Sequence, residues 1–585
     1  MRHRKPICLA IATLALASAM PITTALAADS PEQIRQMQEQ EKAATNFYKA
    51  YFPNLDMAHK AAISFHDLLL EANYESGYLV LELGAQDMVK LRKFGFKLQP
   101  ATEFIQQRKK FLEAMQADTQ QQALRSATPG AAAALAPATI PGYTCYETVE
   151  ETFSQAQAFA TNQPSLATWV DVGDTWEKTA GLGGFDISVL KITNSAIAGP
   201  KPKLFVNSAI HAREYTTAPL NLEFARWLLN GYGTNADATW IVDHHEVHLM
   251  LQSNPDGRKK AETGLAWRKN ANQAYCGATS NTRGADLNRN FSFSFNSTGG
   301  QGSSGVQCDL TYRGASAASE PEVQALEAYV RSLWPDQRGP NPSDAAPSTT
   351  SGMHIDVHSQ GRLVLWPWGT TTTPTGNGNE LQRLGRKLAF FNNHTPKQAI
   401  GLYPTDGTSD SVSYGELGVA AFTIELGTAH FETCTYYNSS IKTQNLNALI
   451  YAAKVVRTPY ITPAGPDVTT VTLSGTAATT GVQVGSLVTL NGSATDIRYN
   501  NVNGTEATQN IAAAEYYIDT PPWQSGAVAS TMVATDGAFN AKTEGIRATI
   551  NTAGLSIGKH TVFVRSRDAL NNWGPISAIF LKVNP

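Results

Sequence analysis

Two hydrophobic stretches, far apart in the chain, each end in residues that can bind a metal ion. Residues 203–210 are apolar and β-branched enough for a buried strand, and His211-Ala212-Arg213-Glu214 follows directly. Residues 353–357 form a second strand-like run, and His358 comes next. Sites in an open α/β sheet form at the carboxyl ends of its strands. The two runs therefore predict an α/β fold in which His211, Glu214 and His358 meet.

A catalytic zinc takes three protein ligands and keeps a fourth position open for water. Two imidazoles and one carboxylate supply three such ligands. Residues 223–229 predict a helix, so His211 and Glu214 lie at a strand-to-helix turn, where positions three apart share a face. The alternative is a solvated helix start, because a His-x-x-Glu pair alone is not specific. The motifs that follow it favour the metal site.

Those motifs lie in a fixed order along the chain, and together they resemble the zinc carboxypeptidase family of carboxypeptidases A and B. The resemblance covers about residues 143–459 and implies an α/β catalytic unit, a mixed twisted sheet with helices on both faces. The motifs are Asn-Pro-Asp-Gly at 254–257, Trp-Arg-Lys at 267–269, Asp-Leu-Asn-Arg-Asn at 286–290, Thr-Tyr-Arg-Gly at 311–314, Trp-Pro-Trp-Gly at 366–369, Tyr403 with Gly407, and Phe-Thr-Ile-Glu-Leu at 422–426.

The resemblance implies a role for each matching residue. It makes His211, Glu214 and His358 the ligands of one zinc ion. The other matches are Asp286, which orients a ligand histidine; Arg268, which polarises the scissile carbonyl; Asn288 and Arg289, which grip the terminal carboxylate of the substrate; Tyr403, which closes over that carboxylate; and Glu425, the catalytic glutamate.

Elementary chemistry supports three of these roles. Glu425 lies in the apolar run 420–426, where desolvation raises carboxyl pKa values and suits a group that acts as base and then as acid. Arg289 offers a planar fork that fits a free carboxylate, which favours an exopeptidase. Arg268 can face the oxyanion, although its assignment rests on Trp-Arg-Lys alone. The alternatives are a glutamate that leaves the strand into solvent and two solvated surface arginines.

Specificity depends on Asp410, which the resemblance places at the bottom of the side-chain pocket. An aspartate there goes with Lys or Arg at the chain end, as in the B type of the family. The alternative is a turn aspartate that bonds nearby backbone amides. Ser411 and Gln360 depart from the family pattern in the same pocket, where a second aspartate and a tyrosine are common.

A cluster of histidines at 244, 245 and 248 is a rival metal tract. Alternation along the strand expected at 247–251 puts successive side chains on opposite faces, so we interpret them as surface or strand histidines. His354 shares a strand face with His358, and packing is the favoured interpretation.

With 585 residues, the chain is long enough for several folded units. We expect a signal peptide at 1–27, a pro-domain-like α+β unit at 28–125, a flexible linker at 126–141, the zinc carboxypeptidase unit at 142–460 and an immunoglobulin-like β-sandwich at 461–585. In the pro-domain-like unit we expect a strand at 77–83, a helix at 86–94 and a strand at 96–98. The sandwich prediction rests on short runs at 484–490, 516–518 and 560–564, with turns at Asn491-Gly492 and Asn503-Gly504.

Removal of the leader, which contains Cys8, leaves four cysteines. Four cysteines in an exported chain permit three disulfide pairings. The resemblance implies a bridge between Cys276 and Cys308, which leaves Cys145 with Cys434. Two free buried thiols are the alternative.

These observations predict a secreted or periplasmic zinc metallocarboxypeptidase that releases single C-terminal residues, leaning to Lys or Arg, from peptides with a free C-terminus. By resemblance it is a zymogen, with Arg125 as a candidate cut site; a permanent accessory domain is the alternative. The formal charge of −3 indicates no general attraction to nucleic acid, and a membrane span is not expected. The sandwich is expected to contact surface polymers, or to stabilise or help export the enzyme. The rivals are a zinc amidase or deacylase acting on acyl-amino acids or cell-wall peptides, and a non-catalytic peptide-binding surface protein.

Overall fold

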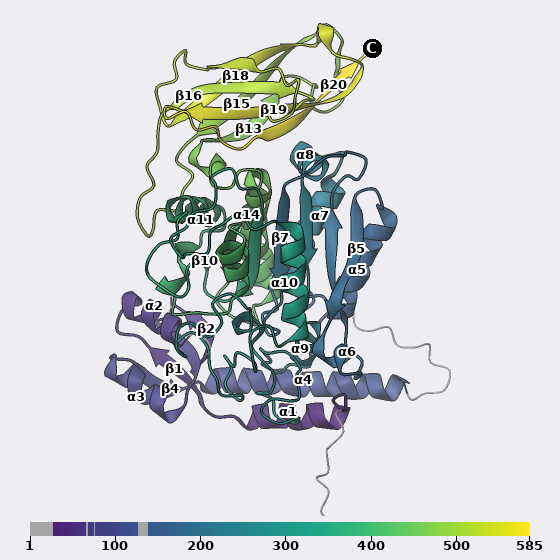
Figure 1. Cartoon of the computed structure of the whole chain (residues 1–585). Helices are drawn as coiled ribbons and strands as arrows, with labels where there is room; N and C mark the ends of the chain where they lie inside the picture. Colours follow the sequence, from purple (N-terminus) through teal and green to yellow (C-terminus); the bar gives the residue numbers. More distant parts are fainter. Residues whose placement is uncertain (1–26, 66–67, 75, 127–138) are drawn as a thin grey trace, which may run out of the picture.

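The chain forms three units, each built on its own β-sheet (Figure 1). The computed structural model describes residues 27–65, 68–74, 76–126 and 139–585. The predicted leader, apart from Ala27, and most of the predicted linker fall outside these residues. The N-terminal unit and the C-terminal unit lie at opposite ends of the central unit (Figure 1).

The central unit contains an eight-stranded mixed sheet in the order β11-β10-β12-β9-β7-β8-β6-β5. The four middle strands, β12, β9, β7 and β8, run parallel to one another. Its strands are β5 (Ala167–Asp174), β6 (Asp186–Ile192), β7 (Lys203–Ser208), β8 (Glu246–Met250), β9 (Met353–Ser359), β10 (Leu363–Trp366), β11 (Thr395–Gln398) and β12 (Ala420–Leu426). Its helices are α5 (Val149–Asn162), α6 (Trp176–Thr179), α7 (Thr217–Gly231), α8 (Ala236–His244), α9 (Pro255–Glu262), η2 (Leu287–Arg289), α10 (Pro321–Leu333), α11 (Gly378–Asn392), η3 (Ala399–Gly401), α12 (Ser409–Ser411), η4 (Val412–Glu416), α13 (Cys434–Tyr436), η5 (Tyr437–Ile441) and α14 (Lys442–Val455).

An apolar cluster covers each face of this sheet, and successive side chains of the middle strands alternate between the two clusters. On β7, Leu204 and Val206 join the apolar cluster formed with α7, α11 and α14. Phe205, between them, joins a second cluster on the opposite face with α10. The α/β fold with helices on both faces is therefore confirmed. The predicted strand at 203–210 ends two residues early, because the backbone turns at Ala209 with a φ of 56°.

The N-terminal unit has an antiparallel sheet in the order β2-β3-β1-β4. The expected strand at 77–83, helix at 86–94 and strand at 96–98 correspond to β3, α3 and β4. The elements are α1 (Pro31–Ala43), β1 (Phe47–Tyr51), α2 (Leu55–Ser64), β2 (Leu69–Asn73), β3 (Tyr78–Glu82), α3 (Ala85–Lys93), β4 (Lys97–Pro100) and α4 (Thr102–Ser126).

The C-terminal unit is all β, and its eight strands form one curled sheet around an apolar core. The predicted strand at 484–490 is wrong in its first three residues, which form the turn between β14 and β15 with Gly485 at a φ of 88°; residues 487–490 belong to β15. The predicted turn at Asn491-Gly492 is also wrong: both residues pair inside β15. The elements are η6 (Thr462–Ala464), β13 (Asp467–Leu473), β14 (Val482–Gln483), β15 (Leu487–Thr495), β16 (Ile511–Ile518), β17 (Ser530–Ala534), β18 (Thr543–Asn551), η7 (Thr552–Gly554), β19 (Gly558–Asp568) and β20 (Ser577–Asn584).

Ion pairs and ring contacts fasten the C-terminal unit to the central unit. Glu506 forms ion pairs with Arg383 and Arg386 of α11 at 3.0 and 2.8 Å. Trp523 stacks on His245 with the guanidinium of Arg457 over its ring. These contacts join the sandwich to the end of the central unit that is farther from the N-terminal unit (Figure 1).

Two disulfides connect loops of the central unit. Cys145 pairs with Cys434, and Cys276 pairs with Cys308. This is the pairing that the resemblance implied. Among the described residues, we find no helix with the length and hydrophobicity needed to cross a bilayer.

Candidate metal and substrate site

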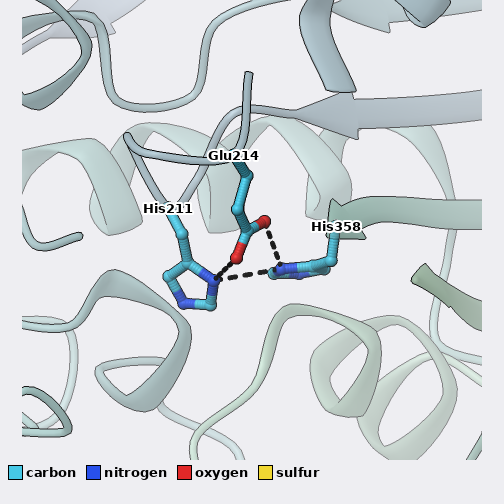
Figure 2. A group of neighbouring side chains, drawn as sticks. All are labelled: His211, Glu214 and His358. Carbon is cyan, nitrogen blue, oxygen red and sulfur yellow. Dashed lines mark hydrogen bonds and ion pairs between the residues drawn. The ribbon is translucent and has the colours of Figure 1, made fainter. Parts of the chain in front are cut away.

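Three side chains converge at the carboxyl ends of the middle strands (Figure 2). His211 and Glu214 come from the turn between β7 and α7, and His358 from the end of β9. Nδ1 of His211 lies 2.8 Å from a carboxylate oxygen of Glu214 and 3.1 Å from Nδ1 of His358. One ligand atom from each residue lies within 4.8 Å of the others, and all three residues are buried. The sequence prediction that these residues meet is confirmed.

Each histidine is held from behind by a buried aspartate. Nε2 of His211 lies 3.0 Å from Asp286, and Nε2 of His358 lies 2.9 Å from Asp356. Both imidazoles therefore present Nδ1 to a common point. Carboxylates that fix the far nitrogen of a ligand histidine orient the ring and raise its basicity.

Buried carboxylates and cationic groups are paired within the site. Burial alone would raise the pKa of Glu214, but the charges of His211 and His358 hold that pKa well below its ordinary value. Burial likewise opposes ionisation of Asp286, yet Arg268 and His211 keep its pKa well below the usual range. Burial would lower the pKa of His358, while Asp356 and Glu214 hold it well above normal.

A zinc ion fits this donor set. Zinc accepts imidazole nitrogen and carboxylate oxygen, and catalytic sites use three such protein ligands. The backbone N–H of Ser359 donates to the second oxygen of Glu214 at 3.0 Å, which fixes the carboxylate. The geometry therefore supplies three oriented and buried donors.

Glu425 lies next to His358 because of strand register. In the parallel pairing of β12 with β9, Glu425 is opposite His358. Its side chain is only 5% exposed, so the predicted desolvation by the run 420–426 agrees with the structure. The alternative of a glutamate that leaves the strand into solvent does not fit this burial.

Two arginines and their neighbours line the region next to the histidines. Arg268 donates through Nε and a terminal nitrogen to Asp286, at 3.1 and 2.9 Å. Arg289, in η2, donates to the hydroxyl of Tyr403 at 3.1 Å. The side-chain amide nitrogen of Asn288 lies 3.1 Å from Nε2 of His358. Neither arginine is a solvated surface residue, since both are 2% exposed.

Asp410 lies close to this cluster and is buried. The hydroxyl of Thr408 donates to it at 2.6 Å and also contacts Ser411. Burial raises the pKa of Asp410 despite that hydrogen bond, and nearby Asp356 raises it further. Gln360, the other departure from the family pattern, is also buried.

The rival histidine tract does not form a metal site. His248 is a strand histidine of β8, which agrees with the interpretation, and His244 ends α8. His245 is 1% exposed and lies outside β8, so the interpretation as a surface or strand residue is wrong for His245. His248 bonds Tyr329 and Glu246, whereas His245 stacks on Trp523. Strand alternation and the contact with the C-terminal unit bury them.

The sequence interpretation missed the roles of Asp356 and Asn207. Asp356 is two residues before His358 on one strand, so period-two alternation could have placed both on the same face. Asn207, on the adjacent β7, donates to Asp356 at 2.8 Å and accepts from His354 at 2.6 Å. His354 therefore packs in a polar chain behind the site and is not a ligand, which agrees with the favoured interpretation.

An α/β sheet with two histidines and a glutamate at its carboxyl edge defines a protein built to hold a divalent metal. The family model described as zinc carboxypeptidase matches residues 153–447, about half of the chain. The chain belongs to this zinc carboxypeptidase family.

Curated relatives match the same part of the chain. Carboxypeptidase A1 of Mus musculus is 28% identical over 292 residues, which cover 48% of this chain and 63% of the relative. A zinc carboxypeptidase of Saccharothrix mutabilis subsp. capreolus is 29% identical over 300 residues, covering 49% and 62%. The match thus spans less than two thirds of the length of each relative.

Solved structures show that the fold is shared over a longer stretch. Thrombin activatable fibrinolysis inhibitor superposes with a TM-score of 0.51 at 18% identity, covering 71% of this chain and 98% of that one. Carboxypeptidase A of Helicoverpa armigera gives a TM-score of 0.50 at 19% identity, covering 71% and 97%. The shared fold therefore extends beyond the residues that the family model matches.

Proposed function

We propose that this protein is a zinc-dependent carboxypeptidase that hydrolyses the last peptide bond of a chain with a free C-terminus. The observation that carries the proposal is the convergence of His211, Glu214 and His358 on one point, with Glu425 in register beside it. The pairing of Arg289 with Tyr403 next to that point supports a substrate with a terminal carboxylate.

The side chains divide the reaction between them. Arg289 holds the terminal carboxylate of the substrate through its planar fork, and the Tyr403 hydroxyl lies beside it to close the pocket. His211, Glu214 and His358 would hold a zinc ion, which would supply acidification of water and polarisation of the scissile carbonyl. Glu425 takes a proton from the attacking water and then gives it to the leaving amine. Arg268, held by Asp286, places a fixed positive charge near the developing oxyanion.

We further propose that Asp410 favours Lys or Arg at the chain end. Its carboxyl is buried, and burial raises its pKa, so ionisation is unfavourable until a cation enters the pocket. An apolar or acidic side chain leaves that carboxyl without a counter-charge, which costs binding energy. The departures at Ser411 and Gln360 alter the shape of the same pocket.

The N-terminal unit is proposed to act as an inhibitory pro-domain. The N–H of Ala72, in β2, donates to the carbonyl of Thr428 at 3.0 Å, and Thr428 follows Glu425 by three residues. His430 lies between two backbone carbonyls, Leu69 of β2 and Ser359, which follows the ligand His358. The unit thus contacts the segment that follows Glu425, and His430 connects this contact to the carbonyl of Ser359. Cleavage near Arg125 or in the linker would free it.

We also propose that the protein is exported, to the periplasm or the medium. The two disulfides suit an oxidising compartment. The proposed division remains residues 28–125, 142–460 and 461–585, for the pro-domain, the catalytic unit and the accessory sandwich. The contacts of the sandwich with α11 favour a stabilising role over attachment to surface polymers.

The proposal is tested with peptide pairs that differ only at the C-terminal group. The processed protein should release Lys or Arg from a peptide with a free α-carboxyl and leave the amidated peptide intact. Equal rates on both peptides would exclude the carboxypeptidase and favour the amidase alternative. Binding without release would favour the non-catalytic peptide-binding protein.

A further inference from the structure

A buried aspartate at the start of the N-terminal unit is inserted into the central unit, away from the metal ligands. Oδ2 of Asp29 lies 2.5 Å from Nζ of Lys260 and 2.6 Å from a terminal nitrogen of Arg283. The side chains of Asp29, Lys260 and Arg283 are 5%, 6% and 0% exposed. A carboxylate shared by two buried cations is a built site, because each charge has its counter-charge at hydrogen-bond distance.

Both cations belong to the central unit and contact the ring of one tryptophan. Nζ of Lys260 lies 5.7 Å from the ring centre of Trp267, and the guanidinium carbon of Arg283 lies 5.3 Å from it. Trp267 directly precedes Arg268. Lys260 has a second anionic partner, Glu177, at 2.9 Å, whereas Asp29 is the only carboxylate that the structure records on Arg283 within the described part of the chain.

Neighbouring contacts attach the same N-terminal segment to the same surface. The side-chain amide of Gln38, in α1, donates to the carbonyl of Thr263 at 2.7 Å. The N–H of Ala266 donates to Glu41 at 2.8 Å. Helix α1 lies along the central unit beside α4 (Figure 1).

We propose that Lys260 and Arg283 form a carboxylate-binding site, separate from the metal site, which Asp29 of the same chain fills and which latches the N-terminal segment onto the central unit. Removal of Asp29 leaves two buried cations with Glu177 alone, so the site then accepts a small free carboxylate. The proposal does not depend on the proposed activity, because it concerns residues that contact neither the metal ligands nor Glu425.

The test is chemical rescue of Asp29→Ala by formate, followed as the unfolding temperature of the full chain. We expect the variant to unfold several degrees below the wild type in sodium chloride and to regain most of that loss in sodium formate of equal ionic strength. The wild type should show no formate-specific gain, because its site is already filled. Asp56→Ala, at an exposed aspartate that pairs with Lys60, is the matched control and should show neither effect.

Hydrogen exchange distinguishes occupation of the carboxylate-binding site from attachment of α1 to the central unit. In Asp29→Ala, exchange should become faster both in α1 and in residues 258–285, and formate should slow only the second segment, since a free anion fills the site without tethering α1. If Asp29→Ala does not fold, Asp29→Asn retains the volume and should show the same faster exchange in α1. Unchanged stability in either variant, or equal effects of formate and chloride on Asp29→Ala, would overturn the proposal.

Discussion

Glu425 and His358 are direct partners in the parallel pairing of β12 with β9. The proposed base and one proposed zinc ligand are therefore fixed relative to each other by the hydrogen bonds of two central strands. His211 and Glu214 come from the turn after β7, the strand on the other side of β9. Loops add substrate contacts around this rigid centre, which is how catalytic sites are commonly supported.

Replacement of Glu425 by glutamine should separate metal binding from turnover. The amide retains the shape of the side chain and cannot take a proton, while the three ligands remain. We expect kcat to fall by about 10²–10⁴-fold, the usual contribution of a general base. Zinc content by elemental analysis should stay at the wild-type value.

Asp174→Asn, at an exposed position at the end of β5 in the central unit, is the matched control and should change neither quantity. Wild-type turnover in Glu425→Gln would show that another group acts as the base. Loss of zinc from that variant would mean that Glu425 supports the metal site, and its kinetics would then say nothing about a base.

Zinc should stabilise the folded protein through the convergent donors. His211, Glu214 and His358 bring one ligand atom each within 4.8 Å of the others, so an ion that they bind stabilises the folded state and not the unfolded chain. The unfolding temperature of chelator-treated protein should rise as free zinc is added. At a zinc concentration of about 1,000 times the dissociation constant, the free energy of unfolding should increase by about 4 kcal/mol. His358→Ala should lose most of that shift, and Glu425→Gln should keep it. An equal shift in His358→Ala would place the ion elsewhere.

Asp410→Asn should weaken the preference for basic chain ends. A buried charge pair that loses one partner costs at least about 2 kcal/mol, roughly 30-fold in kcat/KM. A set of peptides that differ only in the last residue should show this loss for Lys and Arg and little change for Leu or Phe. If the wild type already prefers Leu or Phe, the assignment of Asp410 is wrong, although the carboxypeptidase proposal survives.

The sequence was sufficient for the central sheet and for the convergence of His211, Glu214 and His358, because strong local patterns predict both. Apolar runs identify β7, β9 and β12, and these three residues follow or end two of those runs. The sequence was insufficient where a contact depends on a distant element. Trp523 covers His245, and Tyr329 covers His248. Asn491-Gly492 lies inside β15 because both residues pair with β18.

The latch at Asp29 shows the same limit. A short aspartate-containing segment near the start of a chain has no periodicity that would indicate burial. Its burial depends on Lys260 and Arg283, which are more than 200 residues away in the sequence. Only the assembled structure brings these charges together.

Stability should fall with rising pH because of two buried carboxyls, Asp256 and Glu322. Burial and the charge of Glu177 raise the pKa of Asp256 to about 7, and burial with the charges of Glu320 and Asp256 raises that of Glu322 to about 8. Unfolded, both titrate near pH 4. The folded state therefore holds more protons between these values, so their contribution is complete below about pH 4 and is lost as pH rises through 7 and 8.

Glu322→Gln removes one of these titrations. The variant should gain stability relative to the wild type between about pH 5 and about pH 9, by several kcal/mol if the other contacts are retained. Chemical denaturation of the full chain at the two pH values measures the difference in stability between variant and wild type. Glu113→Gln, at an exposed position of α4, is the control. A difference that is independent of pH, or that changes in the opposite direction, would contradict the assigned titration.

The junction between the sandwich and α11 should contribute to the stability of the central unit. Glu506 is 10% exposed and contacts both Arg383 and Arg386, and Arg386 also donates to the carbonyl of Asn503 at 3.0 Å. Because Arg386 is itself buried, Glu506→Ala leaves a buried cation without its carboxylate. We expect a loss of about 3 kcal/mol in the free energy of unfolding.

Glu103→Ala is the comparison for Glu506→Ala, since Glu103 pairs with Lys49 at 2.7 Å while 77% of its side chain is exposed. An exposed pair of this kind contributes about 0–1 kcal/mol, so this variant should unfold almost as the wild type does. Denaturant unfolding followed by tryptophan fluorescence measures both losses. Equal and small losses in the two variants would mean that the sandwich rests on α11 without stabilising it, and surface attachment would then become the better account of the C-terminal unit.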